Sequence, residues 1–250
     1  MMKKFGLFGT GIQESKSPEL MAQYMPGVPY YLFDTDTVNE FITFISMHRK
    51  QLNGVNVTSP FKNIAYSMTQ ALTRNAMLCK NCNCLAFVNG FIIGHNTDYS
   101  AIYQVLQNII ETNEALYRKY KTQSQKVKIA IMGTGPVAST SAIVAHDFGE
   151  AFLLSRSKST VTDVNGIPIY KYRETPCKPD ILINATPIAK NNMLEDLGMP
   201  GHHRNEIPAI IDWNYKSGEK ISSSTDQYID GLTLLKIQAQ ESVKFWSKFW

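Results

Sequence analysis

An apolar segment that runs into a glycine-rich turn constrains the fold of this chain more than any other feature. Val127–Met132 is apolar and partly β-branched, as expected of a buried strand, and a helix should follow the turn and end near Asp147. In the pattern GxGxxA, the first glycine permits a tight turn, the second lets a pyrophosphate approach the backbone, and the last small residue packs helix on strand. The turn, Gly133-Thr134-Gly135-Pro136-Val137-Ala138, therefore predicts a dinucleotide-binding unit, with a plain tight turn as the alternative.

The end of the next expected strand, Ala151–Leu154, decides which dinucleotide this unit would hold. An NAD site places Asp or Glu about 20 residues after the glycines, where the carboxylate holds the ribose 2′-hydroxyl. Arginine instead grips a phosphate with two parallel hydrogen bonds. Two hydroxyls and two cations follow the strand here, namely Ser155, Arg156, Ser157 and Lys158. We therefore expect NADP(H), with a solvated basic loop as the alternative.

Strands and helices are expected to alternate along the chain, which predicts an α/β protein with parallel sheets covered on both faces. The clearest break in composition is the polar, charged stretch Glu111–Lys128, expected to be the end of a helix and a short connector. We therefore predict an α/β substrate domain at residues 1–110 and a Rossmann-like nucleotide-binding domain at residues 111–230. An amphipathic helix should occupy residues 231–250.

Local signals predict the remaining elements. Helices should start at Pro18, with Ser17 as N-cap, and at Pro60, because proline favours the first helical position. Hairpins are expected about Asn89-Gly90, with a type I′ turn, and about Asn165-Gly166. Other strands should span Lys4–Phe8, Tyr30–Phe33, Gly54–Val57, Asp180–Asn184 and Ala209–Trp213, and other helices Val38–Arg49 and Ala101–Ile110.

Composition excludes several classes of protein. Hydrophobic residues make up 44% of the 250 residues, which is enough for a full core. A formal charge of +4 without a basic run argues against nucleic-acid binding, and no stretch approaches the ~20 apolar residues of a membrane span. Cys79, Cys82 and Cys84 cluster, but no second CxxC or histidine pair completes a zinc set. We therefore expect no metal and reduced thiols in the cytoplasm; monomer and homodimer both stay open.

Three short polar clusters in the first unit lie at loops or helix starts, at Ser15–Pro18, Asn56–Lys62 and Asn96–Asp98. Ligands of α/β sheets bind beyond the carboxyl ends of the strands, so these side chains would suit a polyhydroxylated small molecule. In the first turn of a helix, the dipole favours release of the Lys62 proton, and it favours the carboxylate form of Asp98. The two predict a proton-transfer pair for carbonyl reduction, with two unrelated surface charges as the alternative.

Gln238 stands on a largely apolar face of the C-terminal helix, near Leu234, Leu235, Ser242 and Phe245. A buried amide without partners costs about 1–3 kcal/mol, so this side chain should meet a polar group. A ligand or a backbone carbonyl would satisfy it.

Taken in order, the motifs of the chain resemble those of the shikimate dehydrogenase family. They are SKSP, GVNVTSPFK, GHNTD, the glycine-rich turn, SRS, INATP, DWNY and DGLTLLKIQAQ. The resemblance implies NADP-dependent reduction of 3-dehydroshikimate to shikimate in the pathway to the aromatic amino acids. It also implies a catalytic α/β domain, a Rossmann domain and a C-terminal helix that packs back on the first domain.

The resemblance assigns roles to individual residues. Lys62 would be the catalytic acid/base, paired with Asp98. The side chains that would bind the substrate are Ser15 and Ser17 at the carboxylate, Thr58 through a hydroxyl contact, Asn83 and Asp98 at the ring hydroxyls, and Tyr215 and Gln238 on the other side. The residues that would contact the cofactor are Gly133, Thr134, Gly135, Pro136, Val137, Ser155, Arg156, Ser157, Lys158, Trp213 and Gly231.

Departures from the family pattern cluster in the cofactor half. Pro136 stands where glycine is usual, and the hairpin expected over Val161–Tyr172 replaces a helix. Two other functions stay open. A quinate/shikimate dehydrogenase that uses NAD would prefer an acidic residue near Ser155–Lys158, where there is none. A non-catalytic ligand-binding protein of the same fold would not need both Lys62 and Asp98.

Overall fold

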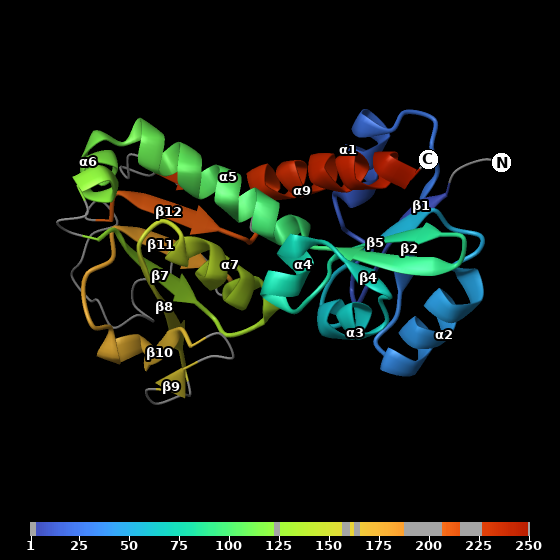
Figure 1. The fold of residues 1–250 in the computed structure, drawn as a ribbon, viewed down its shortest axis with the longest axis horizontal. Coiled ribbons are helices and arrows are strands. Elements are labelled where there is room, and N and C mark those ends of the chain that lie inside the picture. The colour runs from blue at the N-terminus through green and yellow to red at the C-terminus, as the bar shows by residue number, and fades with distance from the viewer. Residues whose placement is uncertain are drawn as a thin grey trace. The chain divides into compact units, whose positions relative to one another are not determined.

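The chain forms two compact units, and each is described by itself. The computed structural model describes residues 4–122, 126–156, 161–162, 166–187, 207–215 and 227–249 (Figure 1). Unit 1 comprises Met1–Ser100 and Leu235–Trp250, and unit 2 comprises Ala101–Leu234. This division falls within the two long helices α5 (Thr97–Thr112) and α9 (Gly231–Trp246), whereas composition suggested ends at residues 110 and 230. The domain boundaries taken from the sequence stay predictions.

The sheet of unit 1 is mixed rather than parallel. Its strand order is β2-β1-β3-β5-β6-β4, in which β2, β1 and β3 run parallel and β5 is antiparallel to both its neighbours. The reversal is the expected hairpin, and its turn residues Asn89 and Gly90 have φ angles of 51° and 83°, as a type I′ turn requires. The strands are β1 (Phe5–Gly9), β2 (Tyr30–Asp34), β3 (Gly54–Val57), β4 (Ala71–Leu72), β5 (Cys84–Val88) and β6 (Phe91–His95).

Two of the predicted helix starts in unit 1 are wrong. Helix α1 (Ser17–Tyr24) already includes Ser17, and Lys16 takes the N-cap position. The hydroxyl of Ser15 accepts from the Ser17 N–H at 3.2 Å. This bond satisfies one of the backbone donors that the first turn of a helix leaves unpaired, so Ser17 can be the first helical residue. Helix α3 (Lys62–Ser67) begins two residues after Pro60, because a turn closed by the Phe61 N–H on the Thr58 carbonyl precedes it. The other helices of this unit are α2 (Val38–His48) and α4 (Arg74–Cys79).

Unit 2 contains a doubly wound sheet. Its order is β13-β12-β11-β7-β8-β10-β9, and all neighbouring strands run parallel except the pair β10 and β9. The order reverses at β7, which places the carboxyl end of that strand at a topological switch point, the usual ligand position in such sheets. Helix α7 (Pro136–His146) packs on β7 and β8 (Figure 1). The strands are β7 (Lys128–Met132), β8 (Glu150–Ser155), β9 (Val161–Thr162), β10 (Pro168–Lys171), β11 (Ile181–Asn184), β12 (Ala209–Asp212) and β13 (Gln227–Ile229).

Two local predictions in unit 2 had different outcomes. The hairpin expected over Val161–Tyr172 is confirmed, because β9 and β10 pair antiparallel with Thr162 opposite Pro168. The short connector expected at Glu111–Lys128 is wrong in part, because much of it is helix α6 (Glu114–Thr122). The Asn113 side chain accepts from the Leu116 N–H at 3.1 Å and caps this helix.

The second half of α9 packs in unit 1, which confirms the C-terminal helix expected there. Trp246 is 2% exposed, packs in a tilted arrangement on Phe5 at 4.5 Å between ring centroids, and donates from Nε1 to the Leu85 carbonyl at 2.9 Å. A Cβ atom at Gly54 would lie 2.3 Å from that nitrogen, so only glycine leaves room for the indole. The helix is thus anchored to β1, β3 and β5 by one aromatic side chain.

Candidate functional site

A buried ion pair lies at the centre of unit 1. Lys62 is the first residue of α3 and Asp98 the second of α5, and Nζ lies 2.7 Å from Oδ2. Lys62 is 5% exposed and Asp98 is 1% exposed. Removing both charges from water is costly unless further hydrogen bonds complete the pair. The sequence predicted that these two residues act together, and the fold brings them into direct contact.

Two amides complete the hydrogen bonding of the Asp98 carboxylate. Its Oδ1 accepts from Asn83 Nδ2 at 2.8 Å and from Gln238 Nε2 at 3.0 Å. Asn83 lies just before β5, and Gln238 lies on α9. Side chains from three separate segments therefore converge on the Asp98 carboxylate, and Asp98 is the polar partner that the apolar surroundings of Gln238 required.

Thr97 belongs to this cluster, although sequence reasoning gave it no role. Its N–H donates to Asn83 Oδ1 at 2.7 Å, and its hydroxyl accepts from Asn83 Nδ2 at 2.9 Å. It is fully buried. These bonds fix the Asn83 amide against the first turn of α5. The sequence feature that could have indicated this role is the position of Thr97 between Asn96 and Asp98 in the NTD motif.

Ser15, Ser17 and Thr58 lie beyond the carboxyl ends of β1 and β3, which are adjacent and parallel. The Ser15 hydroxyl donates to that of Ser17 at 3.1 Å. A Cβ atom at Gly9 would lie 2.2 Å from the Thr58 methyl group, so the threonine packs directly on the end of β1. Within the described part of the chain, no hydrogen bond links either serine to Lys62 or Asp98. Their assignment to a substrate carboxylate stays a prediction.

The glycine turn after β7 has the geometry that its pattern predicts. Gly133 has φ +110°, and a Cβ there would lie 3.1 Å from the Ala185 carbonyl and from the Thr186 methyl group, so a side chain is excluded. Ala138 is fully buried between helix and strand. Gly135 is exposed, and a Cβ there would meet nothing within 4 Å.

The start of α7 suits a dinucleotide pyrophosphate. The helix begins at Pro136 after Gly135, and no side chain caps it in the part of the chain that the structure describes. An open space beside exposed backbone at a helix N-terminus is a site for a negatively charged group. Thr134 is exposed and Val137 is half-buried at the same turn. These residues therefore fit the pyrophosphate that NADP carries.

The other residues expected at the cofactor divide into two groups. Ser155 ends β8 and is buried, whereas Arg156 directly follows it and is exposed; Ser157 and Lys158 lie outside the described residues. Trp213 follows β12 and donates from Nε1 to the Ser141 hydroxyl at 3.2 Å. A Cβ at Gly231 would lie 2.4 Å from the Trp213 carbonyl, so these two positions are in contact. Tyr215 is half-buried in unit 2.

A buried polar network that sequence reasoning missed lies at the carboxyl ends of β11 and β12. Asn184 donates from Nδ2 to Asp212 Oδ1 at 3.1 Å, and the Tyr228 hydroxyl donates to Asp212 Oδ2 at 3.1 Å. Asn184 Oδ1 accepts from the hydroxyl of Thr186 at 2.7 Å. Asn184 and Asp212 are both fully buried. The sequence feature that could have indicated this network is the polar residue at the end of each apolar strand, ILIN and AIID. The network fixes the loops beside Gly133.

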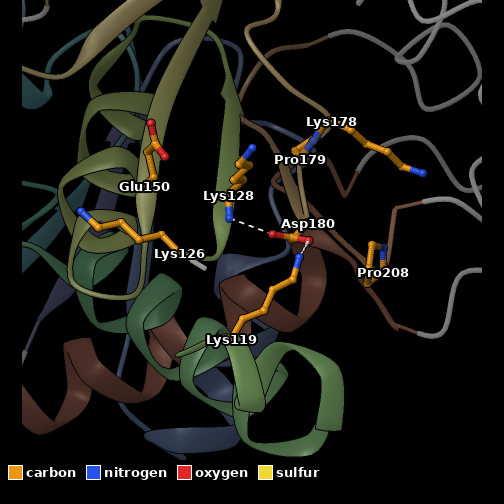
Figure 2. Close-up of a pocket in the computed structure, with 8 residues that line it drawn as sticks. All are labelled: Lys119, Lys126, Lys128, Glu150, Lys178, Pro179, Asp180 and Pro208. Carbon is orange, nitrogen blue, oxygen red and sulfur yellow. Dashed lines mark hydrogen bonds and ion pairs between the residues drawn. The ribbon is translucent and has the colours of Figure 1, made fainter. Parts of the chain in front are cut away.

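A basic pocket of about 620 Å³ lies at the opposite edge of this sheet (Figure 2). Lys128 and Glu150 begin their strands and Asp180 precedes its strand, so the pocket is at the amino ends. Asp180 binds Lys119 Nζ at 2.6 Å and the Lys128 N–H at 2.9 Å, which joins α6 to the sheet. This pocket is therefore separate from the glycine turn. Its lining is Lys119, Lys126, Lys128, Glu150, Lys178, Pro179, Asp180 and Pro208.

The four cysteines are reduced thiols. Burial raises the pKa of Cys82 to about 12 and that of Cys84 well above its usual range, so neither is a thiolate at neutral pH. Within the described ranges, no three His, Cys, Asp or Glu side chains are placed to hold a metal ion. The helices of the described segments include none that is long and apolar enough to cross a bilayer.

His95 precedes the NTD motif and is buried. Its ring stacks on Phe245 at 4.7 Å between centroids, and Nδ1 lies 2.8 Å from the Thr73 hydroxyl. Burial, aided by Lys248 and Lys244, lowers the pKa of His95 from 6.5 to about 4. The imidazole is therefore neutral in the folded protein at pH values where it would be charged in the unfolded chain.

We expect this histidine to make stability depend on pH. Between pH 6.5 and pH 4 the unfolded chain binds a proton that the folded chain does not, so stability falls as pH falls through that window. The expected loss between pH 7 and pH 5 is about 2 kcal/mol, measured by urea unfolding at each pH. His95→Gln should lack this part of the slope. Equal slopes for both proteins would contradict the assignment.

Comparison with known proteins points to one family. Residues 7–85 match the family described as the shikimate dehydrogenase substrate binding domain. A protein of Psychromonas ingrahamii named shikimate dehydrogenase (NADP(+)) is 26% identical, with 98% of this chain and 93% of that protein covered. One of the same name from Clostridium beijerinckii is 24% identical, covering 99% and 93%. A crystal structure of a shikimate dehydrogenase in complex with NADP+ has the same fold, with a TM-score of 0.77, 21% identity and coverage of 99% and 90%.

Proposed function

We propose that this chain, which belongs to the shikimate dehydrogenase family, catalyses the reversible NADPH-dependent reduction of 3-dehydroshikimate to shikimate. This reaction belongs to the pathway to chorismate and the aromatic amino acids. The observation that carries the proposal is the buried Lys62–Asp98 pair, at 2.7 Å, within motifs typical of this family. The similarity of named relatives over nearly the whole chain supports it.

Lys62 supplies the proton in this proposal. When bound, NADPH would supply a hydride to the carbonyl carbon of the substrate. The Lys62 ammonium donates a proton to the carbonyl oxygen in reduction, and the amine takes it back in oxidation. Asp98 holds Lys62 at a fixed position through its Oδ2. Removal of water from both groups strengthens their electrostatic effect on the reacting oxygen.

The remaining contacts orient the substrate. Asn83 and the Asp98 carboxylate bind ring hydroxyls, and Gln238, which also meets Asp98, closes the other side of the substrate. Ser15 and Ser17 hold the carboxylate of the substrate and Thr58 adds a contact through its hydroxyl; their position beyond the ends of β1 and β3 supports these roles. Tyr215 would also contact the substrate. A substrate held by several groups is oriented before proton transfer, which lowers the barrier.

The cofactor is assigned to unit 2. Gly133–Val137 would hold its pyrophosphate at the start of α7, where even a Cβ atom on Gly135 would meet nothing within 4 Å. Arg156, with Ser155, Ser157 and Lys158, would bind the 2′-phosphate, which NADP has and NAD lacks. Trp213 and Gly231 would contact the cofactor from the other side of the switch point.

Arg156→Ala should therefore raise the KM for NADP+ strongly and leave that for NAD+ nearly unchanged. Loss of a hydrogen bond to a charged group costs about 1.5–3 kcal/mol, which corresponds to roughly 10- to 100-fold. Initial rates with each nucleotide at saturating shikimate measure the effect, with the exposed, distant Arg118→Ala as a matched control. Equal losses with both nucleotides would contradict the 2′-phosphate assignment.

One assay tests the proposed function. The purified protein is incubated with NADP+ or NAD+, each with shikimate or quinate, and formation of the reduced nucleotide is followed by absorbance. Turnover that is best with shikimate and NADP+ is the expected result. Preference for NAD+ or for quinate would favour a quinate/shikimate dehydrogenase. Binding of shikimate without turnover would favour a non-catalytic protein.

We also propose that the protein works in the cytoplasm, where its thiols stay reduced. All four cysteines lack disulfides, and three of them are buried. Sedimentation of the purified protein distinguishes a monomer from a homodimer.

A further inference from the structure

Asp98 owes its position to the first turn of α5. The side chain of Asn96 precedes this helix, and its Oδ1 accepts from the N–H of Tyr99 at 3.0 Å. An acceptor at this spacing is an N-cap, which satisfies one of the unpaired donors of the turn. Asn96 is fully buried, so water does not replace it. The cap therefore fixes the turn on which Thr97 and Asp98 stand.

Asn81 holds the Asn96 amide in the orientation that capping requires. Asn96 Nδ2 donates to Asn81 Oδ1 at 2.8 Å and to the Asn81 carbonyl at 3.2 Å. Both atoms are acceptors, so they favour the amide rotamer with nitrogen toward Asn81 and oxygen toward Tyr99. The opposite rotamer would place two oxygens together and two donors together. Asn81 thereby selects the capping state.

The end of α4 in turn fixes Asn81. Its Nδ2 donates to the carbonyl of Cys79, the last residue of that helix, at 2.9 Å. Lys80, between them, has φ +52°, which turns the chain sharply after α4. Asn81 is 2% exposed. A continuous set of hydrogen bonds thus runs from the end of α4 through Asn81 and Asn96 to the start of α5.

We propose that Asn81 is a positioning residue for the reaction, because through Asn96 it fixes the helix start that carries Asp98 beside Lys62. The inference rests on the proposed function, in which Asp98 orients Lys62. Asn81 is not among the residues assigned to the substrate, and in this proposal it acts through Asn96. Its loss should affect the chemical step more than the binding of nucleotide.

Three variants test this role. Asn81→Ala should lower kcat for shikimate oxidation about tenfold and leave the KM for NADP+ unchanged, because a small displacement of a reacting group is costly. Asn81→Asp keeps an oxygen that accepts from Asn96 and loses the donor to Cys79, so it should lose stability yet retain more kcat than Asn81→Ala. Asn113→Ala, which removes the cap of α6, is the matched control: its denaturation midpoint falls and its kcat does not change.

Coupling to Asp98 separates positioning from a general loss of structure. Adding Asn81→Ala to Asp98→Asn should lower kcat little further, because the positioned carboxylate is already gone. A folded Asn81→Ala protein with wild-type kcat would overturn the inference. So would an equal tenfold loss in the Asp98→Asn background, or an Asp variant no better than the Ala variant. Wild-type protein that does not oxidise shikimate with NADP+ would overturn the proposed function and this inference together, whereas active wild type with unaffected variants overturns the inference alone.

Discussion

Lys62→Ala should lower kcat for shikimate oxidation by about 10²–10⁴, the usual contribution of a general acid/base. Binding of shikimate should change far less, because its carboxylate and most of its hydroxyls have other partners. The limb of the pH–rate profile that belongs to the lysine should disappear. Initial rates across pH, with shikimate binding measured by calorimetry, give all three results. Lys119→Ala, which removes another ion-paired lysine, is the control and should leave kcat unchanged.

Asp98→Asn should lower kcat too and also weaken binding, since that carboxylate would hold both a hydroxyl and the lysine. The double variant should be scarcely worse than the poorer single one, because the two residues act as a unit. Breaking a buried pair destabilises by about 3–5 kcal/mol, so folding must be checked, and Lys62→Met keeps the volume of the side chain. A folded Lys62 variant with more than about a tenth of wild-type kcat would contradict the acid/base role.

Trp246→Ala should destabilise the protein by about 3–5 kcal/mol, the range for removing a large buried aromatic side chain. The indole packs against Gly54 and the Phe5 ring, so its loss leaves a cavity and removes the hydrogen bond that it donates to the Leu85 carbonyl. Because α9 also carries Gln238, we expect a higher KM for shikimate in the protein that stays folded. Urea unfolding and initial rates measure the two effects.

Trp246→Phe separates the packing of this residue from its hydrogen bond. Phenylalanine keeps most of the apolar contact and lacks the Nε1 donor, so the loss should be about 1–3 kcal/mol. If Trp246→Ala unfolded at the same urea concentration as the wild type, α9 would not be anchored through this residue. Equal losses for both variants would assign the stability to the hydrogen bond alone.

Features that depend on a few neighbouring residues were predictable from the sequence. The turn at Gly133 and the hairpin at Asn89-Gly90 each need backbone angles that glycine or asparagine supplies most easily, and the structure has those angles. The alternation of apolar segments identified the central strands of both sheets. Lys62 and Asp98 were paired by their chemistry and by family motifs, and they lie in contact.

Features that depend on competition or on distant partners were not predictable. Ser15 and Ser17 were both available at one helix start, and the hydroxyl of Ser15 bound the N–H of Ser17, which shifted the cap. Helix α6 lacks a broad apolar face, and its only buried residue is Leu116, so a polar connector was the simpler interpretation. The Asn184–Asp212 contact joins residues far apart in the chain, whose proximity only the sheet creates.

The discontinuity of unit 1 has a consequence for synthesis. Residues 101–234, which form unit 2, leave the ribosome before Leu235–Trp250, which complete unit 1. Domains generally fold as their sequence emerges, so unit 2 can fold while the core around Phe5 still lacks its indole. Synthesis of Leu235–Trp250 therefore determines both when the core of the first unit is completed and when Asp98 acquires the amide of Gln238.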